Sequence, residues 1–442
     1  MFMGFLVHGH RWMLDTVRMS APLSAWILLA LSTLGLLMTV AAIVRATRLG
    51  WGNTVWFLAG FLTTELAIFH IVLSALLALV FALTTDALQA APGQLGLVLM
   101  MVSWAGLLLA QWRARPTGRI LEQALQSALG ADYRERIPES RRAQLRDVVP
   151  WRELATPVAL RSPGVEWIRN LPYFDGHERQ VLDIYRPAGG CTNAPVLLQI
   201  HGGAWMLGNK HEQGLPLVYH LAARGWVVVT PNYRLSPRAR FPDHLVDLKR
   251  ALAWVKRNVA GYGGDPGFVA LTGGSAGGHL TSLLALTAND QRLQPGFEHV
   301  DTTVAAAVPF YGVYDFTDRH GLKGSGTDMV LWLEKTVMPC SPRQDPALWD
   351  LASPITLVRR DAPPFFILHS THDSLASVEE ARHFAAALRS VSKQPVVYAE
   401  LPGAQHAWDI IRSKRAMESV HAVTRFLEWA HADARTRARR QQ

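Results

Sequence analysis

The chain has 442 residues, of which 49% are hydrophobic, and it carries a formal net charge of +9. Its length allows a large core and more than one structural unit, whereas its two cysteines, Cys191 and Cys340, exclude a disulfide framework. We expect free thiols, with a single bridge as the alternative. The excess arginines flank the apolar N-terminal region and fill the C-terminal end, so we attribute the charge to contact with membrane lipids, not to nucleic acid binding.

Long apolar stretches dominate residues 1–112, and we predict an all-α transmembrane region there. Residues 22–44 carry no charge and are long enough, as a helix, to cross ~30 Å of hydrocarbon. The stretch is too long for the apolar core of a cleaved signal peptide, the competing interpretation of a basic start followed by apolar residues. Two further spans are predicted at about 55–83 and 94–112.

Arginines near the spans predict the orientation of the chain in the membrane. Arg45 and Arg48 lie between the first two spans and three arginines follow the third, whereas residues 84–93 contain no Lys or Arg. Because basic loops face the cytoplasm, we expect a multi-pass protein of the plasma membrane with a cytoplasmic C-terminal domain. Arg11 and Arg18, before the first span, oppose this orientation.

Glu65 and His70 interrupt the second predicted span. Ionisable residues in lipid are candidates for function, but a spacing of five separates this pair by about 140° around a helix. We therefore expect no joint site. The two side chains face other helices, or the span starts later and Glu65 lies near the interface.

Residues 113–162 are rich in Arg and Glu, with apolar residues at helical spacing, and predict a linker of one or two amphipathic helices. From residue 163 to 434 strand patterns alternate with helical ones, which indicates a mostly parallel sheet of eight strands covered by helices on both faces. Residues 435–442 form a basic tail. The predicted strands are an antiparallel hairpin at 167–174 and 180–185, followed by 195–200, 226–230, 268–272, 304–310, 365–368 and 396–401; predicted helices include 242–259 and 379–388.

Residues with catalytic potential follow four of these strands. The first group is His201-Gly202-Gly203-Ala204-Trp205, in which two glycines allow backbone N–H groups to face an anion. The second is residues 273–278 (GGSAGG), a strand-turn-helix pattern typical of the nucleophile elbow of an α/β-hydrolase. The turn is strained, so the positions two before and two after Ser275 must be small, as Gly273 and Gly277 are. Asp373 and His406 follow the seventh and eighth strands, giving the chain order oxyanion loop, Ser, Asp, His.

This arrangement predicts acyl transfer through a covalent acyl-enzyme, with no cofactor and no metal. Ser275 attacks the carbonyl carbon, His406 moves the proton, and Asp373 orients His406. The backbone N–H groups of Gly203, Ala204 and Ala276 bind the oxyanion, and Gly202 shapes the loop. Trp205 lines the substrate pocket or packs under the loop. We expect His201 to fix the loop by hydrogen bonding and His279 to be structural.

On these motifs the chain resembles the esterases and lipases of the hormone-sensitive-lipase-like group over about residues 165–430, and its HGGAW form is similar to kynurenine formamidases and related carboxylesterases. Gly274 stands where the lipase-like members have an acidic residue. Ala204 stands where they have a third glycine, which matters little if the backbone is not left-handed there. The resemblance also implies that helices in 113–162 cap the acyl pocket; a simple stalk is the alternative.

We therefore predict a membrane-anchored serine carboxylesterase or lipase acting on an apolar small-molecule or lipid ester. The first alternative is an amide or formamide hydrolase of the kynurenine formamidase type. The second is a catalytically silent hydrolase scaffold that acts as a membrane sensor or binding module. The sequence leaves the acyl chain, the alcohol and the oligomeric state open.

Overall fold

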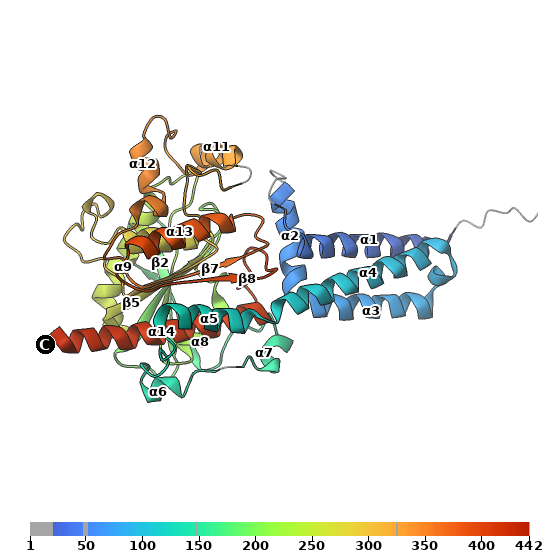
Figure 1. Cartoon of the computed structure of the whole chain (residues 1–442), viewed down its shortest axis with the longest axis horizontal. Coiled ribbons are helices and arrows are strands. Elements are labelled where there is room, and N and C mark those ends of the chain that lie inside the picture. Colours follow the sequence, from blue (N-terminus) through green and yellow to red (C-terminus); the bar gives the residue numbers. More distant parts are fainter. Residues whose placement is uncertain (1–20, 47–51, 147, 324–325, 442) are drawn as a thin grey trace, which may run out of the picture.

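The computed structural model describes residues 21–46, 52–146, 148–323 and 326–441. An elongated bundle of apolar helices projects from one side of a globular domain built on a single sheet (Figure 1). Arg11, Arg18 and Arg48, on which part of the predicted orientation rests, lie outside the described residues.

Three helices run side by side in the bundle: α1 (Leu23–Ile43), α3 (Ala67–Thr84) and α4 (Ala91–Ala114), with the 3₁₀ turn η1 (Ala87–Gln89) between the last two (Figure 1). Each is long and apolar enough to cross a membrane. Small residues allow α1 and α4 to approach closely, since a Cβ on Gly96 would lie 3.1 Å from the backbone of Leu29. The hydroxyls of Thr39 and Ser103 are hydrogen-bonded across this contact at 2.7 Å.

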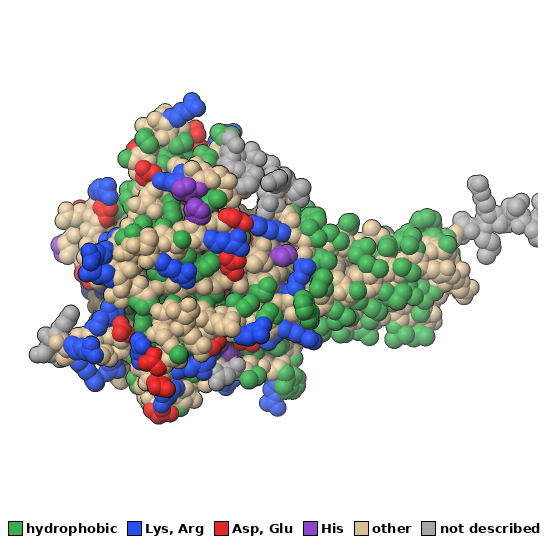
Figure 2. Space-filling view, viewed as in Figure 1, with side chains coloured by type: hydrophobic (Ala, Val, Ile, Leu, Met, Phe, Trp, Pro, Cys, Tyr) green, Lys and Arg blue, Asp and Glu red, His purple; other side chains and the backbone are tan. Residues whose placement is uncertain are grey.

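The outer surface of the bundle is apolar. Side chains such as Leu73 and Leu83 are 69% and 76% exposed, and Figure 2 shows hydrophobic groups covering the bundle while charged groups gather on the globular domain. Exposed apolar surfaces of this extent are typical of faces that contact lipid or another protein.

The prediction of one helix over 55–83 is wrong. The segment forms two helices, α2 (Gly52–Glu65) and α3, and α2 runs across the end of the bundle beside the globular domain (Figure 1). Gly60 makes this crossing possible, because a Cβ there would lie 2.5 Å from the carbonyl oxygen of Ala41 in α1. Glu65 therefore precedes the apolar helix α3 and is not inside it.

The globular domain contains an eight-stranded sheet in the order β1-β2-β4-β3-β5-β6-β7-β8. Strands β1 and β2 form the predicted antiparallel hairpin, β2 pairs antiparallel with β4, and the remaining pairs are parallel. This topology confirms the predicted α/β-hydrolase fold class. The strands are β1 (Val165–Pro172), β2 (Val181–Pro187), β3 (Ala194–Ile200), β4 (Val227–Pro231), β5 (Gly264–Gly274), β6 (Ala306–Phe310), β7 (Phe365–Ser370) and β8 (Val396–Leu401).

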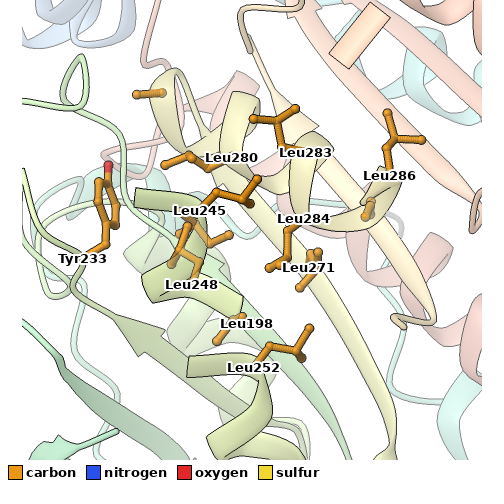
Figure 3. Close-up of a cluster of buried hydrophobic side chains, with 14 of the residues drawn as sticks. Leu198, Tyr233, Leu245, Leu248, Leu252, Leu271, Leu280, Leu283, Leu284 and Leu286 are labelled. Atoms are coloured by element: carbon orange, nitrogen blue, oxygen red, sulfur yellow. The ribbon is translucent and has the colours of Figure 1, made fainter. Parts of the chain in front are cut away.

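Helices cover both faces of the sheet because its central strands are buried on both sides. On one face α10 packs against α9 and strands β3 and β5 through fully buried leucines, several of which Figure 3 shows. Burying each such side chain contributes about 1.5–3 kcal/mol. This core holds α10 in place directly behind Ser275. The helices of this domain are α8 (Leu215–Ala222), α9 (Asp243–Asn258), α10 (Ala276–Leu286), α11 (Gly326–Thr336), α12 (Pro346–Leu351), α13 (Val378–Val391) and α14 (Lys414–Gln441).

Residues 113–162 were expected to form either a cap over the acyl pocket or a simple stalk, and the structure differs from both. Helix α5 (Thr117–Leu129) packs on the opposite face of the sheet, against α14 and β8, with Leu121 and Leu125 fully buried. It is followed by the short helices α6 (Glu139–Arg142) and α7 (Trp151–Ala155). Within residues 113–146 and 148–162, the linker thus contributes to the domain core, and its helix α5 is neither a cap over the active site nor a free stalk.

The residues predicted as a separate basic tail continue helix α14 to Gln441, and those from Arg435 onward are exposed where described. Cys191 and Cys340 are both free thiols.

Candidate active site

Ser275 occupies a strained turn between β5 and α10. Its backbone has φ 60° and ψ −124°, a conformation rarely adopted by a residue with a side chain. A Cβ on Gly273 would lie 2.6 Å from the carbonyl oxygens of Gly277 and Ile200, and one on Gly277 would lie 2.2 Å from that of Ile200. No larger residue fits at either position, and this close packing raises the half-buried hydroxyl of Ser275 above the sheet edge.

His406 and Asp373 form a buried pair. Nδ1 of His406 donates a hydrogen bond of 2.7 Å to Oδ2 of Asp373, while Oδ1 accepts 2.8 Å bonds from the N–H groups of Leu375 and Ala376. Burial favours the neutral carboxylic acid, but the charge and hydrogen bond of His406 outweigh it, and the pKa of Asp373 lies below its ordinary value. The carboxylate is therefore ionised, and it fixes the proton of His406 on Nδ1.

The second ring nitrogen of His406 is free for proton transfer. Nε2 is buried and makes no hydrogen bond to any residue within the described ranges. Tyr311 connects this ring to the nucleophile: its ring lies 4.5 Å from that of His406, and its hydroxyl lies 2.5 Å from where a Cβ of Gly274 would be. The structure thus brings Ser275, Asp373 and His406 to the carboxyl ends of β5, β7 and β8, with the Ser–His hydrogen bond unformed.

Tyr311 explains the missing acidic residue at position 274. Its ring and hydroxyl fill the space that a side chain on Gly274 would need. The hydroxyl donates to Asp409, so a carboxylate is present near the elbow but comes from a residue three positions after His406. The sequence pattern did not indicate this pair, which is separated by 98 residues.

The loop after β3 lies against the nucleophile. The N–H of Gly202 donates to Oε1 of Gln213 at 2.7 Å and so fixes the loop, while a Cβ on Gly202 would lie 3.1 Å from Cβ of Ser275. The N–H groups of Gly203 and Ala204 make no backbone hydrogen bond in the part of the chain that is described. Ala276 is the first residue of α10, where the N–H has no partner within the helix.

Ala204 does adopt a left-handed backbone, with φ 53°. We expected alanine in place of glycine to matter little only if the backbone at this position were not left-handed. The observed left-handed conformation instead favours glycine, which the lipase-like members of the resembled group have here. Alanine keeps the N–H but adds strain to the loop.

Trp205 packs beneath the loop, the second of the two placements predicted for it. It is 3% exposed, and its Nε1 donates to Nδ1 of His279 at 3.2 Å. Nδ1 of His201 donates to the carbonyl of Gly202 at 2.8 Å, and its ring stacks on Tyr233. Burial lowers the pKa of His201 and that of His279 to about 3, so both are neutral and hold the loop by hydrogen bonding.

Comparison with known proteins decides the family. Residues 182–388 match the family model described as BD-FAE. The probable carboxylic ester hydrolase LipM of Mycobacterium tuberculosis is 48% identical over 340 residues, which cover 74% of this chain and 76% of LipM. The chain belongs to the LipM-like carboxylic ester hydrolases. Esterase LipQ of the same organism is 42% identical over 72% of the chain and 75% of LipQ.

The fold of this esterase also occurs in solved structures. Esterase B of Lactobacillus rhamnosis superimposes with a TM-score of 0.54 at 22% identity, over 63% of this chain and 90% of that one. The chain is thus a carboxylic ester hydrolase of the α/β-hydrolase fold.

In this esterase the N-terminal helices reach the active site. The ring of Phe57 in α2 meets that of His406 edge-on, with 5.8 Å between the centroids. Nη1 of Arg113 in α4 lies 3.4 Å from Nε2 of His372, in the loop that carries Asp373. Glu65 indicated that the apolar span could start later, but neither contact was predicted, because both join segments far apart in the chain.

Proposed function

We propose that this esterase is a membrane-anchored serine hydrolase that cleaves apolar carboxylic esters with Ser275, His406 and Asp373. The observation that carries the proposal is the 2.7 Å hydrogen bond between buried His406 and Asp373, next to a serine in a strained elbow. Family membership supports ester hydrolysis, and the geometry supports these three residues as its catalytic groups.

In the first half-reaction Oγ of Ser275 bonds to the ester carbonyl carbon and its proton moves to Nε2 of His406. The N–H groups of Gly203, Ala204 and Ala276 stabilise the oxyanion, each by about 2.7–4 kcal/mol. The C–O bond to the alcohol then breaks, and the alcohol leaves with the proton from His406. In the second half-reaction water attacks the acyl-enzyme, His406 accepts its proton, and the acid is released as Ser275 is regenerated.

The apolar bundle supports anchoring in a membrane, with α1, α3 and α4 as the spans. Arg45 and Arg113 lie at the end of the bundle next to the catalytic domain, where they contact Glu379 and His372. Basic residues on this side favour a cytoplasmic catalytic domain. Such an anchor keeps the active site close to esters that partition into lipid, whether small molecules or lipids themselves.

Activity-based labelling tests the proposal. Full-length protein in detergent is treated with a fluorophosphonate probe, beside Ser275→Ala and, as a matched control, Ser282→Ala in the buried part of α10. We expect wild type and Ser282→Ala to label and Ser275→Ala to remain unlabelled. Labelling of Ser275→Ala, or none of the wild type, would overturn the proposal.

A substrate panel separates esters from formamides. LipM and LipQ carry the names of ester hydrolases, which favours ester cleavage. We expect p-nitrophenyl esters to be hydrolysed at least about 100-fold faster, in kcat/KM, than N-formylkynurenine. A reversed preference would instead support the formamidase alternative.

A further inference from the structure

Helix α2 is the only described helix of the apolar region that runs across the bundle instead of along it (Figure 1), and its Phe57 contacts the active-site residue His406. Phe57 contacts the ring of His406, and Phe61, one turn further, stacks on Phe57 with 4.8 Å between the centroids. Both rings are half-buried. An aromatic surface from outside the hydrolase domain thus adjoins the residue that protonates the leaving group.

Contacts on both sides hold α2 in this position. Glu65 at its end pairs with Arg415 of α14 at 3.1 Å, and the two side chains are 3% and 1% exposed. Thr64 donates to the carbonyl of Ala42 in α1, and Gly60 lets the two helices touch. A helix fixed to both the bundle and the hydrolase domain can serve as a wall of the site.

The outer side of α2 is apolar. Val55, Leu58 and Leu62 are 69%, 59% and 38% exposed, and their spacing places them along one side of the helix, away from Phe57. This stripe continues the apolar surface of the bundle. The pattern is that of a helix lying in a membrane interface with one face in lipid.

A cavity of about 340 Å³ opens where the two parts of the molecule meet. Arg45 and Asn53 line it from the apolar region, and Val313, Met329 and Asp373 line it from the hydrolase domain. Its volume is in the range of sites for small ligands. Residues of both parts therefore line an open space beside the loop that carries Asp373, whereas Phe57 and His406 lie outside this lining.

The position of Phe57 indicates which half of the ester it meets. The departing alcohol oxygen takes its proton from Nε2 of His406, so it must come within about 3 Å of that atom. The group attached to this oxygen then lies near the ring of His406, which Tyr311 and Phe57 both contact, with 4.5 and 5.8 Å between the ring centroids. The acyl group, bonded to Ser275, extends from the other side of the carbonyl carbon.

We propose that α2 forms the alcohol side of the ester-binding site and that Phe57 and Phe61 select substrates with an extended apolar alcohol. The inference rests on the proposed function and deepens it, because it assigns the substrate class and a second role to the N-terminal region. Substrates of this class are esters of alkyl or other lipid-like alcohols, which reach the site from the lipid that contacts the outer side of α2.

Two ester series in nanodiscs test this assignment on the full chain. One series consists of butyrates whose alcohol grows from two to twelve carbons, and the other of p-nitrophenyl esters whose acyl chain grows over the same range. For Phe57→Ala we expect kcat/KM to fall about tenfold or more for the long alcohols and to change less than about threefold for ethyl butyrate. The acyl series should change by one common factor, and Phe57→Leu should restore most of the selectivity.

Leu58→Ala is the matched control, because Leu58 is a neighbour on the outer side of α2 and should leave both series unchanged. The assignment is overturned if Phe57→Ala alters the dependence on the acyl chain but not that on the alcohol, or leaves both as in wild type. Fluorophosphonate labelling of Phe57→Ala distinguishes a wrong assignment of α2 from a wrong proposed function. If the variant is still labelled, Ser275 remains the nucleophile and only the assignment of α2 is wrong.

A crosslinking measurement on wild type removes any dependence on the folding of variants. A p-nitrophenyl phosphonate with a diazirine on its alkoxy chain reacts at Ser275: Oγ bonds to phosphorus, p-nitrophenolate leaves, and His406 takes the serine proton. Irradiation should then join the alkoxy chain to a peptide from residues 52–65. Crosslinks of this probe only within residues 163–441, or crosslinks to α2 only from a probe with the diazirine on the alkyl chain, would contradict the proposal.

Discussion

The carboxylate of Glu65 and the guanidinium of Arg415 lie 3.1 Å apart in an ion pair that is almost completely excluded from solvent. Arg415 also donates to the carbonyls of Ala110 and Pro402, so one cation connects α2, α4 and the loop before His406. The pair is the deepest charged contact between the apolar region and the hydrolase domain among the residues described. It places α2 relative to the active site.

Breaking this pair should destabilise the protein strongly. Glu65→Leu leaves Arg415 as an unpaired buried charge, and Arg415→Met does the same to Glu65, so each should lower the free energy of unfolding by about 3–5 kcal/mol. The double variant removes both charges and should recover most of that loss. Thermal unfolding of full-length protein in detergent measures the effect, and a double variant no more stable than either single one would contradict it.

Asp373→Asn should reduce activity far more than stability. The asparagine amide can donate to Nδ1 of His406 and so stabilises the wrong tautomer, which should lower kcat by about 10,000-fold. Hydrolysis of p-nitrophenyl butyrate measures the loss, and thermal unfolding shows whether the variant is folded. A folded variant that keeps more than a tenth of wild-type kcat would exclude Asp373 as the residue that orients His406.

Ala204→Gly should stabilise the oxyanion loop. Removing the strain of a left-handed alanine should raise the free energy of unfolding by about 1–2 kcal/mol. The greater conformational freedom of glycine in the unfolded chain should lower it by about 0.4–1 kcal/mol. The N–H group remains, so kcat should stay within about threefold. Ala204→Val, with a branched side chain at the same φ, should instead destabilise by more than about 1 kcal/mol. Equal melting temperatures for the two variants would contradict this account.

The contact between Glu379 and Arg45 should make part of the stability depend on pH. The hydrogen bonds from Arg45 lower the pKa of Glu379 to about 2, against an ordinary value of 4.5. A carboxyl with a depressed pKa stabilises the fold above its ordinary pKa, and this stabilisation is lost as the pH falls from about 4.5 to 2. Both side chains are about a third exposed, at 32% and 34%, so solvent limits the contribution to less than about 1 kcal/mol.

Glu379→Gln tests this pH dependence. We expect the variant to melt below wild type at pH 6 and the difference to shrink as the pH is lowered toward 3. Glu178→Gln, at an exposed position of the β1–β2 turn, serves as a control. A difference that grows toward low pH would show that the sign is wrong.

Local sequence patterns predicted the hydrolase domain well. The parallel strands β3, β4, β6 and β7 are short, mainly apolar runs, and the conformation of Ser275 requires glycines at positions that the sequence shows. The later start of the span was considered because of Glu65, but the crossing direction of α2 could not be predicted, since Leu66, where the direction changes, is neither Gly nor Pro. The contacts of Phe57 with His406 and of Tyr311 with Asp409 depend on tertiary packing between segments far apart in the chain.

Helix α14 begins beside α2 and ends on the side of the hydrolase domain farthest from the bundle (Figure 1). Its 28 residues correspond to a rigid rod of about 42 Å. A fluorescent protein fused behind this helix would therefore be held clear of the bilayer and of the catalytic pocket. The fluorescence of this fusion would show on which side of the membrane the catalytic domain lies. The fusion would not disturb ester cleavage.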